Sequence, residues 1–535
     1  MTEAARSLVE DHERTIGATD RRRLGAHYTP EHLARRIVEA GIAELGHVPE
    51  LVCDPACGAG SFLLAAADAL TARGADPADV VNRRLIGGEI DPVAAAVARR
   101  ALVAWAHSHE VSDAIEPVVV VCDTLATPPD RWLGGRTGRI DLVVGNPPFL
   151  GQLSSDTARD REEREAATRR FGSIGAYTDS SALFLLVAVE LLAPGGVSVM
   201  LQPQSLLSAR DARPVRSRLL TTADLVGFWA TDDRPFDAGV HVCAPMFRRR
   251  PNAPVDDALE GSPEVVLRWG PDVEVAGTCP APGDGPWGPL LAGLSGVPSV
   301  ADRGGPRLSS LATATAGFRD EFYALAEAAR NPGEHGWSDT APRLVTVGMI
   351  DPGRVSWGST PRLLAGRRMA SPRLDMAALV AAAPRVADWV SKRSVPKVLV
   401  ATQTRVIEAA ADPAGTDIPV TPTISVEPFD GDDVWRVTAA LLAPPVAARA
   451  VATHFGAGLS SSALRWSARA VLDVELPSDD RLWDLGAACC RELVHASADA
   501  RPALLRRLGG LMLRAHGYGA DHPVEEWWAE RVVSA

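Results

Sequence analysis

The chain has 535 residues, of which 46% are apolar and 23% charged, an ordinary globular composition that allows about three domains of roughly 150 residues each. No apolar run reaches the about 18 residues that a membrane helix requires, and the charged N-terminus lacks the apolar segment of a secretory signal. We therefore expect a cytoplasmic protein without a membrane span. The seven cysteines have no metal-ligand spacing, so we also expect reduced thiols and no metal site.

The net charge of −12 argues against a nucleic-acid partner, because phosphate binding usually leaves a basic footprint. Net charge does not describe a local face, however. Nearly every positive charge is an arginine, since the only lysines are Lys392 and Lys397. The arginine guanidinium can form two hydrogen bonds at once to a phosphate or to a guanine edge. The composition therefore argues against DNA binding without excluding it.

The first half of the sequence alternates short β-rich runs with Ala-rich helical runs. Strands are predicted within the stretches 51–54, 83–92, 116–125, 138–149 and 197–203, and helices within 63–74, 93–109 and 180–196. Strands that alternate with helices at this spacing form a parallel sheet, whose ligands bind at the carboxyl ends of the strands. The predicted fold of residues 1–250 is therefore a Rossmann-like α/β domain.

The character of the sequence changes near residue 250. Residues 251–307 are rich in Pro, Gly and Asp, which predicts a linker and irregular surface. Beyond them, strands are predicted within 343–357, 396–410 and 419–429, and helices within 434–455 and from Asp480 onward. Residues 251–535 are accordingly predicted to form an irregular α+β domain.

Polar side chains close four of the predicted strands. They are Asp54, Glu89, Asp123 and Asn146. Because the carboxyl ends of parallel strands meet at one edge of a sheet, we expect these side chains to converge. Gly58 and Gly60 follow the first strand and let the backbone pass close to a ligand. A carboxylate after the second strand suits a ribose, but neither the dinucleotide nor the phosphate-loop glycine pattern is present. The expected ligand contains an adenosine and a cation rather than a pyrophosphate.

The stretches GAHYTP (25–30), DPACGAGSF (54–62), GGEIDP (87–92), the strand end at Asp123 and NPPF (146–149) occur in this order. In this combination the chain resembles the gamma-class N6-adenine DNA methyltransferases, the TaqI-like and type I or IIG-like group. TATAGFRDEFYAL (313–325), PKVLVATQTR (396–405) and SSSALRWSARAVLDVELP (460–477) are similar to the target-recognition domains of such enzymes. The resemblance thus implies a methyltransferase domain in residues 1–250 and a target-recognition domain in residues 251–535.

The resemblance implies S-adenosylmethionine (AdoMet) as the cofactor. Asp54 would face its amino group, Glu89 its ribose, Asp123 its adenine amino group and Ile90 its purine face. The complete set of cofactor-binding residues implied in this way is Tyr28, Thr29, Pro30, Asp54, Ala56, Gly58, Gly60, Glu89, Ile90 and Asp123.

The resemblance places the chemistry in NPPF. The amino group of adenine is a poor nucleophile, and two acceptors, the Asn146 side-chain oxygen and the Pro147 carbonyl, would localise its lone pair. Pro147 and Pro148 stiffen the loop, so that both acceptors are oriented in advance. Phe149 would stack on the flipped-out base, a contact worth roughly 1–3 kcal/mol. Phe247, in FDAGVHVCAPMFRRR (236–250), would provide a second aromatic wall.

Each of these residues has a plainer interpretation as well. NPPF alone is equally typical of a turn that ends a strand, and Asp54 could cap the helix that follows it. Glu89 and Asp123, taken singly, are more typical of surface carboxylates, and Phe247 would serve equally well in a core. The arginines within 158–171 and 248–250 are typical of solvated faces, with contact to the DNA backbone as the alternative.

Neither lysine follows an acidic residue by two positions, as a PD-(D/E)xK nuclease requires, and the Walker lysine of an ATP-driven motor is missing. We therefore predict an AdoMet-dependent, site-specific DNA adenine-N6 methyltransferase of a restriction–modification or phage-defence system. It would act on double-stranded DNA, and any cleavage would belong to a separate restriction or defence subunit. Two alternatives remain: an N-methyltransferase acting on RNA or on a protein glutamine, and a catalytically silent subunit that binds DNA and senses AdoMet.

Overall fold

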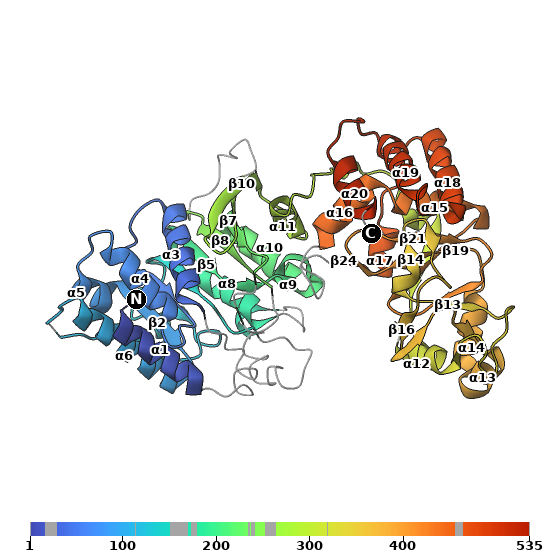
Figure 1. Ribbon diagram of the computed structural model, residues 1–535. Helices are drawn as coiled ribbons and strands as arrows, with labels where there is room; N and C mark the ends of the chain where they lie inside the picture. Colours follow the sequence, from blue (N-terminus) through green and yellow to red (C-terminus); the bar gives the residue numbers. More distant parts are fainter. Residues whose placement is uncertain are drawn as a thin grey trace. The chain divides into compact units, whose positions relative to one another are not determined.

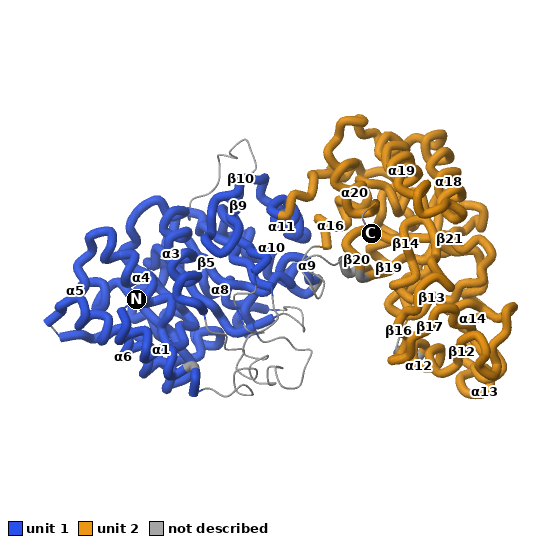
Figure 2. Tube along the Cα trace, in the orientation of Figure 1, with its two compact units in different colours: residues 1–294 blue, residues 295–535 orange. Residues whose placement is uncertain are grey.

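The structure is a computed structural model that describes residues 2–15, 29–112, 114–149, 169–172, 179–233, 236, 241–251, 264–317, 319–454 and 464–533. The chain divides into two compact units, Met1–Leu294 and Ser295–Ala535 (Figure 2). Each unit has its own sheets and its own buried apolar core.

Unit 1 is built around one large, mostly parallel sheet. The strand order is β10-β9-β7-β8-β5-β4-β1-β2-β3, and the short β6 pairs with β8. Strands β3, β2, β1, β4 and β5 run parallel to one another, whereas β8 lies antiparallel between β5 and β7. The strands are β1 (Val52–Asp54), β2 (Leu85–Glu89), β3 (Val118–Val121), β4 (Ile140–Gly145), β5 (Leu192–Met200), β6 (Gln202–Pro203), β7 (Ala223–Ala230) and β8 (Val242–Arg249). All five strands predicted for this half are present, and the α/β fold class is confirmed.

Helices cover both faces of this sheet (Figure 1). On one face, α3 packs on β4 and β5, α4 on β1 and β2, and α6 on β2 and β3. On the other, α8 packs on β4, β5 and β8, and α10 on β7. The bounds are α3 (Glu31–Leu45), α4 (Ser61–Thr71), α6 (Pro92–Ser108), α8 (Ser180–Leu191) and α10 (Arg213–Thr222), while α1 (Glu3–Thr15) lies on α6.

The helix ends follow from local chemistry. The Asp91 side chain accepts from the Val93 backbone N–H at 2.8 Å, and Pro92 takes the first helical position of α6, where no N–H is needed. Asp179 caps α8 in the same way through Ser181 N–H, at 2.9 Å. Helix α8 ends at Leu191, shortly before Pro194, which cannot donate to the helix ladder. These caps fix where α6 and α8 begin.

The structure places the domain boundary later than the predicted position at residue 250. Within the predicted linker of about 251–307, β9 (Glu264–Trp269) pairs parallel with β7, and β10 (Glu274–Pro280) pairs with β9. Helix α11 (Gly288–Leu294) then packs on β7 and β9. Residues 264–294 therefore complete the sheet of unit 1, and the boundary falls between Leu294 and Ser295.

Unit 2 combines two small four-stranded sheets with two-stranded hairpins. One sheet has the order β11-β23-β19-β21 and is antiparallel; the other has the order β12-β18-β13-β22. The first sheet consists of β11 (Ala312–Ala316), β23 (Thr423–Pro428), β19 (Lys397–Ala401) and β21 (Ala409–Asp412). The second consists of β12 (Ala329–Arg330), β18 (Arg373–Leu374), β13 (Arg343–Val345) and β22 (Asp417–Pro419). The hairpins are β14 (Ile350–Asp351) with β15 (Arg354–Val355), and β16 (Arg362–Leu364) with β17 (Arg367–Met369).

The C-terminal part of unit 2 is helical, as predicted. Helices α18 (Asp480–His495), α19 (Arg501–Ala515) and α20 (Val524–Val533) pack in sequence, and α15 (Val434–Leu441) and α16 (Pro444–His454) pack against them. In the part of the chain that the structure describes, no helix has both the length and the apolar character needed to cross a bilayer. The α+β character predicted for the second half is confirmed.

Candidate active site

Four polar residues lie at the carboxyl edge of the unit 1 sheet, as predicted. Asp54 and Glu89 are the last residues of β1 and β2, Asn146 directly follows β4, and Asp123 lies two residues beyond β3. These four strands are consecutive neighbours in the sheet. The edge is narrow: a Cβ built at Gly145 would approach a carboxylate oxygen of Asp54 to 2.7 Å. Only glycine at position 145 lets the end of β4 pass beside the Asp54 carboxylate.

The glycine-rich turn after β1 is held to the end of β2. The Cys57 N–H donates to the Gly88 carbonyl at 3.0 Å, and the Gly58 N–H donates to the Glu89 carboxylate at 2.8 Å. Both Gly58 (φ 53°) and Gly60 (φ 98°) have positive φ. A Cβ at Gly60 would press on Ala98 of α6 at 3.3 Å, whereas a Cβ at Gly58 would meet open space. Gly60 thus serves helix packing, and Gly58 faces room for a ligand.

The two carboxylates of this turn are held by backbone N–H groups in a buried setting. Asp54 is 1% exposed and accepts from the Ala56 N–H at 3.0 Å; burial raises its pKa to about 8, and the Glu89 carboxylate adds to this shift. Glu89 accepts from Gly58 N–H through one oxygen and from Asp91 N–H, at 2.9 Å, through the other. Burial also raises the pKa of Glu89. Asp54 is buried and Glu89 half-buried, and among the described residues neither carboxyl group has a cationic side chain as a partner, an arrangement that fits a ligand that brings a positive charge.

The neighbouring positions fit the adenosine part of such a ligand. Ile90, directly after Glu89, is 60% exposed, which is unusual for a large apolar side chain beside a buried turn. Asp123 accepts from the backbone N–H groups of Leu125 and Ala126 through one oxygen, at 2.9 and 3.2 Å. Asp123 is therefore held in a defined orientation at the strand end. The residues present fit AdoMet, with its ammonium and sulfonium charges and its ribose and purine.

Thr29 of the GAHYTP stretch is hydrogen-bonded to the NPPF loop. The Asn146 amide nitrogen donates to the Thr29 hydroxyl oxygen at 3.0 Å, and Thr29 is buried. Pro30 follows Thr29 and directly precedes α3. Tyr28 lies outside the described residues. The contact brings two stretches predicted for cofactor and acceptor binding together at one place.

The NPPF loop is anchored from α8. The Ser180 hydroxyl, 1% exposed at the start of that helix, donates to the Pro148 carbonyl at 2.8 Å. The buried Gln202 amide in turn donates to the Ser181 carbonyl at 2.9 Å. Among the described residues, none donates to the Pro147 carbonyl. The prolines and the Ser180 bond together hold the Pro148 end of the loop in place.

The aromatic neighbour of Phe149 is Phe236, and the prediction for Phe247 is wrong. The Phe149 and Phe236 rings lie edge to face with centroids 6.4 Å apart. Phe247 is fully buried within β8, where it pairs with Ser198 of β5 and contacts the buried Trp287 ring at 5.8 Å. It is a core residue in the middle of the sheet and cannot reach a base. Phe236 belongs to the same quoted stretch, six residues before the start of β8.

Arg170 is a site residue that sequence reasoning missed. Its guanidinium donates to the carbonyls of Thr124, Leu125 and Thr127, at 2.5, 2.8 and 3.1 Å, and pairs with Glu190 at 2.8 Å. It thereby fastens the loop that carries the Asp123 carboxylate. Arg170 lies in the arginine-rich stretch 158–171, of which residues 158–168 are outside the described part. The 11% side-chain exposure of Arg170 rules out a solvated face for this arginine.

Three further arginines, at positions 248–250, are also structural. Arg248 donates to the Glu44 carbonyl, Arg249 to the Glu190 and Leu192 carbonyls, and Arg250 pairs with Asp224 at 2.6 Å. Neither the solvated face nor the DNA contact considered for them describes these side chains. The described residues contain no group of three or more His, Cys, Asp or Glu side chains that could hold a metal ion.

Comparisons with known proteins match this part of the chain to one family. Residues 14–243 match the family model described as N-6 DNA Methylase. The methylase subunit of the type I restriction enzyme EcoEI of Escherichia coli is 26% identical over 201 residues, which are 37% of this chain and 36% of that protein. The chain thus spans about a third of the length of this curated relative.

Two solved structures resemble the fold over nearly the whole chain. The type IIL restriction-modification enzyme MmeI, solved in complex with DNA, has a TM-score of 0.62 at 13% identity, with 99% of this chain and 81% of that chain covered. The DrdV–DNA complex has a TM-score of 0.51 at 13% identity, with 93% and 60% covered. At this identity the likeness shows the fold alone, and it extends over both units. The strand-end site thus lies within the part of the chain, residues 14–243, that matches the N-6 DNA Methylase family.

Proposed function

We propose that this chain transfers a methyl group from AdoMet to N6 of an adenine flipped out of double-stranded DNA, in a restriction–modification or phage-defence system. The observation that carries this proposal is the placement of NPPF. The loop directly follows β4, its Asn146 amide is bonded to Thr29, and the strand ends beside it carry Asp54 and Glu89. An acceptor loop beside a cation-binding carboxyl pair is what methyl transfer from a sulfonium to an amino group requires.

On the cofactor side, AdoMet would supply a methyl group already activated by its sulfonium charge. The Asp54 carboxylate would bind the ammonium group, and Glu89 would retain acceptor capacity for the ribose hydroxyls, because each of its oxygens accepts one backbone N–H. Ile90 would cover the purine, and Asp123 would accept from its amino group. Positioning therefore provides most of the rate enhancement, and no strong general base is needed.

On the acceptor side, Asn146 and Pro147 would accept the two hydrogens of the adenine amino group. The bond from Asn146 Nδ2 to Thr29 turns the amide oxygen to the opposite side of the group, away from Thr29. The Ser180 hydroxyl already occupies the Pro148 carbonyl, which leaves the Pro147 carbonyl for the base. Phe149 would stack on the extruded adenine, and Phe236 would support that ring from its edge.

Unit 2 would act as the target-recognition domain. The fold likeness to MmeI, an enzyme solved with DNA, covers both units and supports this role. The Escherichia coli relative is a subunit of a type I enzyme, which supports assembly with a separate restriction or defence subunit. The methylated sequence would then be chosen by unit 2 and the chemistry performed by unit 1.

Tritiated methyl transfer from AdoMet to unmethylated genomic DNA tests the proposal, with nucleoside analysis to identify N6-methyladenine. The Asn146→Ala variant should retain AdoMet binding, because its side chain lies on the acceptor side, and should lose at least about a hundredfold in rate. Label in RNA or in a protein glutamine would select the first alternative function. AdoMet binding without any methyl transfer would select the silent subunit.

A further inference from the structure

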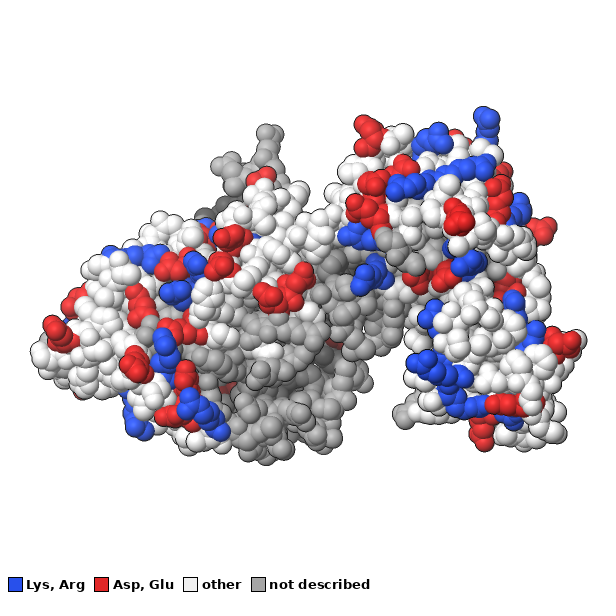
Figure 3. All heavy atoms as spheres, viewed as in Figure 1, with Lys and Arg blue, Asp and Glu red and all other residues white. Residues whose placement is uncertain are grey.

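A strongly basic stretch interrupts this acidic chain. Between residues 343 and 373 the sequence contains six arginines and one acidic residue, Asp351, a local charge of +5 in a chain of net charge −12. The six are Arg343, Arg354, Arg362, Arg367, Arg368 and Arg373. On the face drawn in Figure 3, basic side chains gather over the part of unit 2 where Figure 1 places β16 and α12 (Arg319–Ala328). Clustering of this kind is the electrostatic footprint of a nucleic-acid partner.

The stretch contains a tight β-hairpin, β16–β17. Leu363 pairs with Arg368 across the hairpin, and the two tip residues, Ala365 (φ 47°) and Gly366 (φ 82°), both have positive φ. This is the geometry of a type I′ turn, which gives the ribbon a defined twist. Buried Leu364 and Met369 anchor the hairpin in the apolar core of unit 2. The hairpin is therefore a fixed ribbon rather than a loose loop.

Both faces of the ribbon carry exposed side chains: Leu363 and Arg368 share one face, and Arg362 shares the other with the buried Met369. Leu363 is 68% exposed, and Arg362, Arg367 and Arg368 are exposed as well. Arg367 forms an ion pair with Glu334 at 2.8 Å. Arg362 and Arg368, by contrast, have neither an ion pair nor a hydrogen bond with any described residue. Two uncompensated guanidinium groups on a fixed ribbon favour an anionic partner that lies along it.

The other arginines of the stretch are held inward. Arg343 pairs with Asp417 at 2.5 Å, and Arg373 donates to the Ala341 carbonyl and stacks on Trp357 at 4.9 Å. The side chains of Arg343 and Arg373 thus bind groups within unit 2. The cations available to a partner are thus concentrated on β16 and β17.

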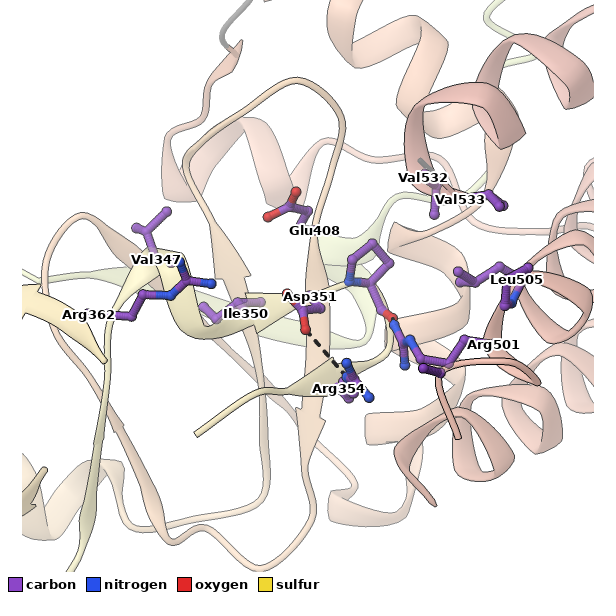
Figure 4. A pocket seen from close by; sticks show the side chains of 14 residues that line it. Val347, Ile350, Asp351, Arg354, Arg362, Glu408, Arg501, Leu505, Val532 and Val533 are labelled. Carbon is purple, nitrogen blue, oxygen red and sulfur yellow. Dashed lines mark hydrogen bonds and ion pairs between the residues drawn. The ribbon is translucent and has the colours of Figure 1, made fainter. Parts of the chain in front are cut away.

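A cavity of about 420 Å³ lies at the base of the hairpin, within unit 2. Figure 4 shows the guanidinium of Arg362 pointing into it from β16, with Asp351 and Arg354 at its centre and Glu408 on another side. Burial, with Asp351 nearby, raises the pKa of Glu408 to about 7. In DNA-binding proteins, arginine side chains read guanine edges, and acidic side chains read cytosine edges.

We propose that the β16–β17 hairpin lies in the major groove of double-stranded DNA, with Arg368 contacting a guanine edge and Arg362, on the other face of the ribbon, contacting a flanking phosphate. A two-stranded ribbon fits the major groove, whose width is about 12 Å. The exposed Leu363, on the same face as Arg368, would contact a thymine methyl group. This inference rests on the proposed function, since it names the element of unit 2 that reads the substrate of unit 1.

The test compares two double variants of the full chain. Arg362→Ala/Arg368→Ala removes the hairpin cations, and Arg385→Ala/Arg481→Ala removes two exposed arginines that have no partner among the described residues and lie on α14 (Pro384–Arg393) and α18. Affinity for unmethylated genomic DNA fragments is measured at several salt concentrations, together with AdoMet binding and thermal melting. Wild-type methyl transfer to the same DNA is measured first, so that failure of the proposed function is seen independently.

The hairpin variant should bind DNA at least about tenfold more weakly, with a slope of log affinity against log salt reduced by up to about two. Its AdoMet affinity and melting temperature should equal those of the wild type. Arg362→Lys/Arg368→Lys should recover binding in part, because it restores charge without the guanidinium fork. Equal DNA affinity of the hairpin and control variants, or an unchanged salt slope and affinity in the hairpin variant, would overturn the inference, whether or not the wild type methylates.

Discussion

The Asn146 amide nitrogen donates to the Thr29 hydroxyl oxygen at 3.0 Å, although the two residues are 117 positions apart in the sequence. A carboxamide presents its nitrogen and its oxygen on opposite sides, so a partner for one fixes the direction of the other. The hydroxyl of Thr29 thus orients the acceptor oxygen proposed for the adenine. The same bond connects Thr29, proposed to lie beside the cofactor, with the loop proposed to bind the adenine.

Thr29→Val keeps the shape of the side chain and removes the acceptor. We expect the single-turnover rate at saturating AdoMet to fall about five- to tenfold, the value of one hydrogen bond of about 1 kcal/mol. Thr29→Ser, which keeps the hydroxyl, should restore most of the rate. Rapid-quench measurement of methyl transfer separates this effect from a change in AdoMet KM, and a wild-type single-turnover rate in the valine variant would contradict it.

The raised pKa of Asp54, about 8 against an ordinary 3.8, makes cofactor binding dependent on pH. Below pH 8 the ligand-free carboxyl is mostly protonated, and a cationic ligand favours its ionised form, so binding releases a proton. Affinity should therefore rise as pH rises from 6 to 7.5, by up to about tenfold for each unit. Calorimetry with S-adenosylhomocysteine, in two buffers of different ionisation enthalpy, measures both the affinity and the proton.

The raised pKa of Asp54 has the opposite effect on the stability of the ligand-free protein, which should decrease as pH rises. An unfolded Asp ionises near pH 3.8, whereas the folded group remains protonated until about pH 8. The free energy of unfolding should consequently fall as pH rises through this window. In Asp54→Asn both pH dependences should flatten; pH-independent affinity in the wild type would show that Asp54 does not face the cation.

Arg170 should control cofactor affinity through the Asp123 loop. Arg170→Ala removes three hydrogen bonds to the carbonyls of residues 124, 125 and 127, so we expect AdoMet KM to rise about tenfold while kcat at saturating AdoMet stays near the wild-type value. Lysine at this position should rescue only in part, because an ammonium lacks the planar fork that reaches the three carbonyls through Nη1 and Glu190 through Nη2. The neighbouring Arg169→Ala, at an exposed position, is the matched control. Equal effects on kcat and KM would point to general loss of structure instead.

Phe149 and Phe247 should respond differently to the same substitution. Phe247→Leu opens space beside the buried Trp287, and we expect it to lower the melting temperature by a few degrees without a selective change in DNA KM. Phe149→Leu, at a half-buried position, should leave the melting temperature nearly unchanged and lower kcat/KM for DNA about tenfold or more. Scanning calorimetry and steady-state kinetics on both variants test the pair. A selective DNA defect in the Phe247 variant would restore the original assignment.

Hydrophobic patterning was sufficient to predict strands β1 to β5 but not β7 or β8. It also brought Asp54, Glu89 and Asn146 to one edge, because a parallel sheet fixes where strand ends meet. It did not distinguish Phe236 from Phe247, since both belong to one short stretch and both are buried, Phe236 beside Phe149 and Phe247 within β8. The strand signal of EVVLRW in β9 was masked by the Pro, Gly and Asp residues around it, and β10 has mostly exposed side chains, which leaves little apolar alternation to read. The role of Arg170 could not be predicted, because its partners are backbone carbonyls, which carry no sequence signature.

The late position of the domain boundary has a practical consequence for chimeras. A methyltransferase half cut after residue 250 would lose β9, leave the hydrogen-bonding edge of β7 bare, and remove the indole of Trp287 from above Phe247. Such a fragment would present an open strand to other copies of itself and aggregate. Exchange of specificity between relatives should therefore join the two halves after Leu294, where the sheet is already complete.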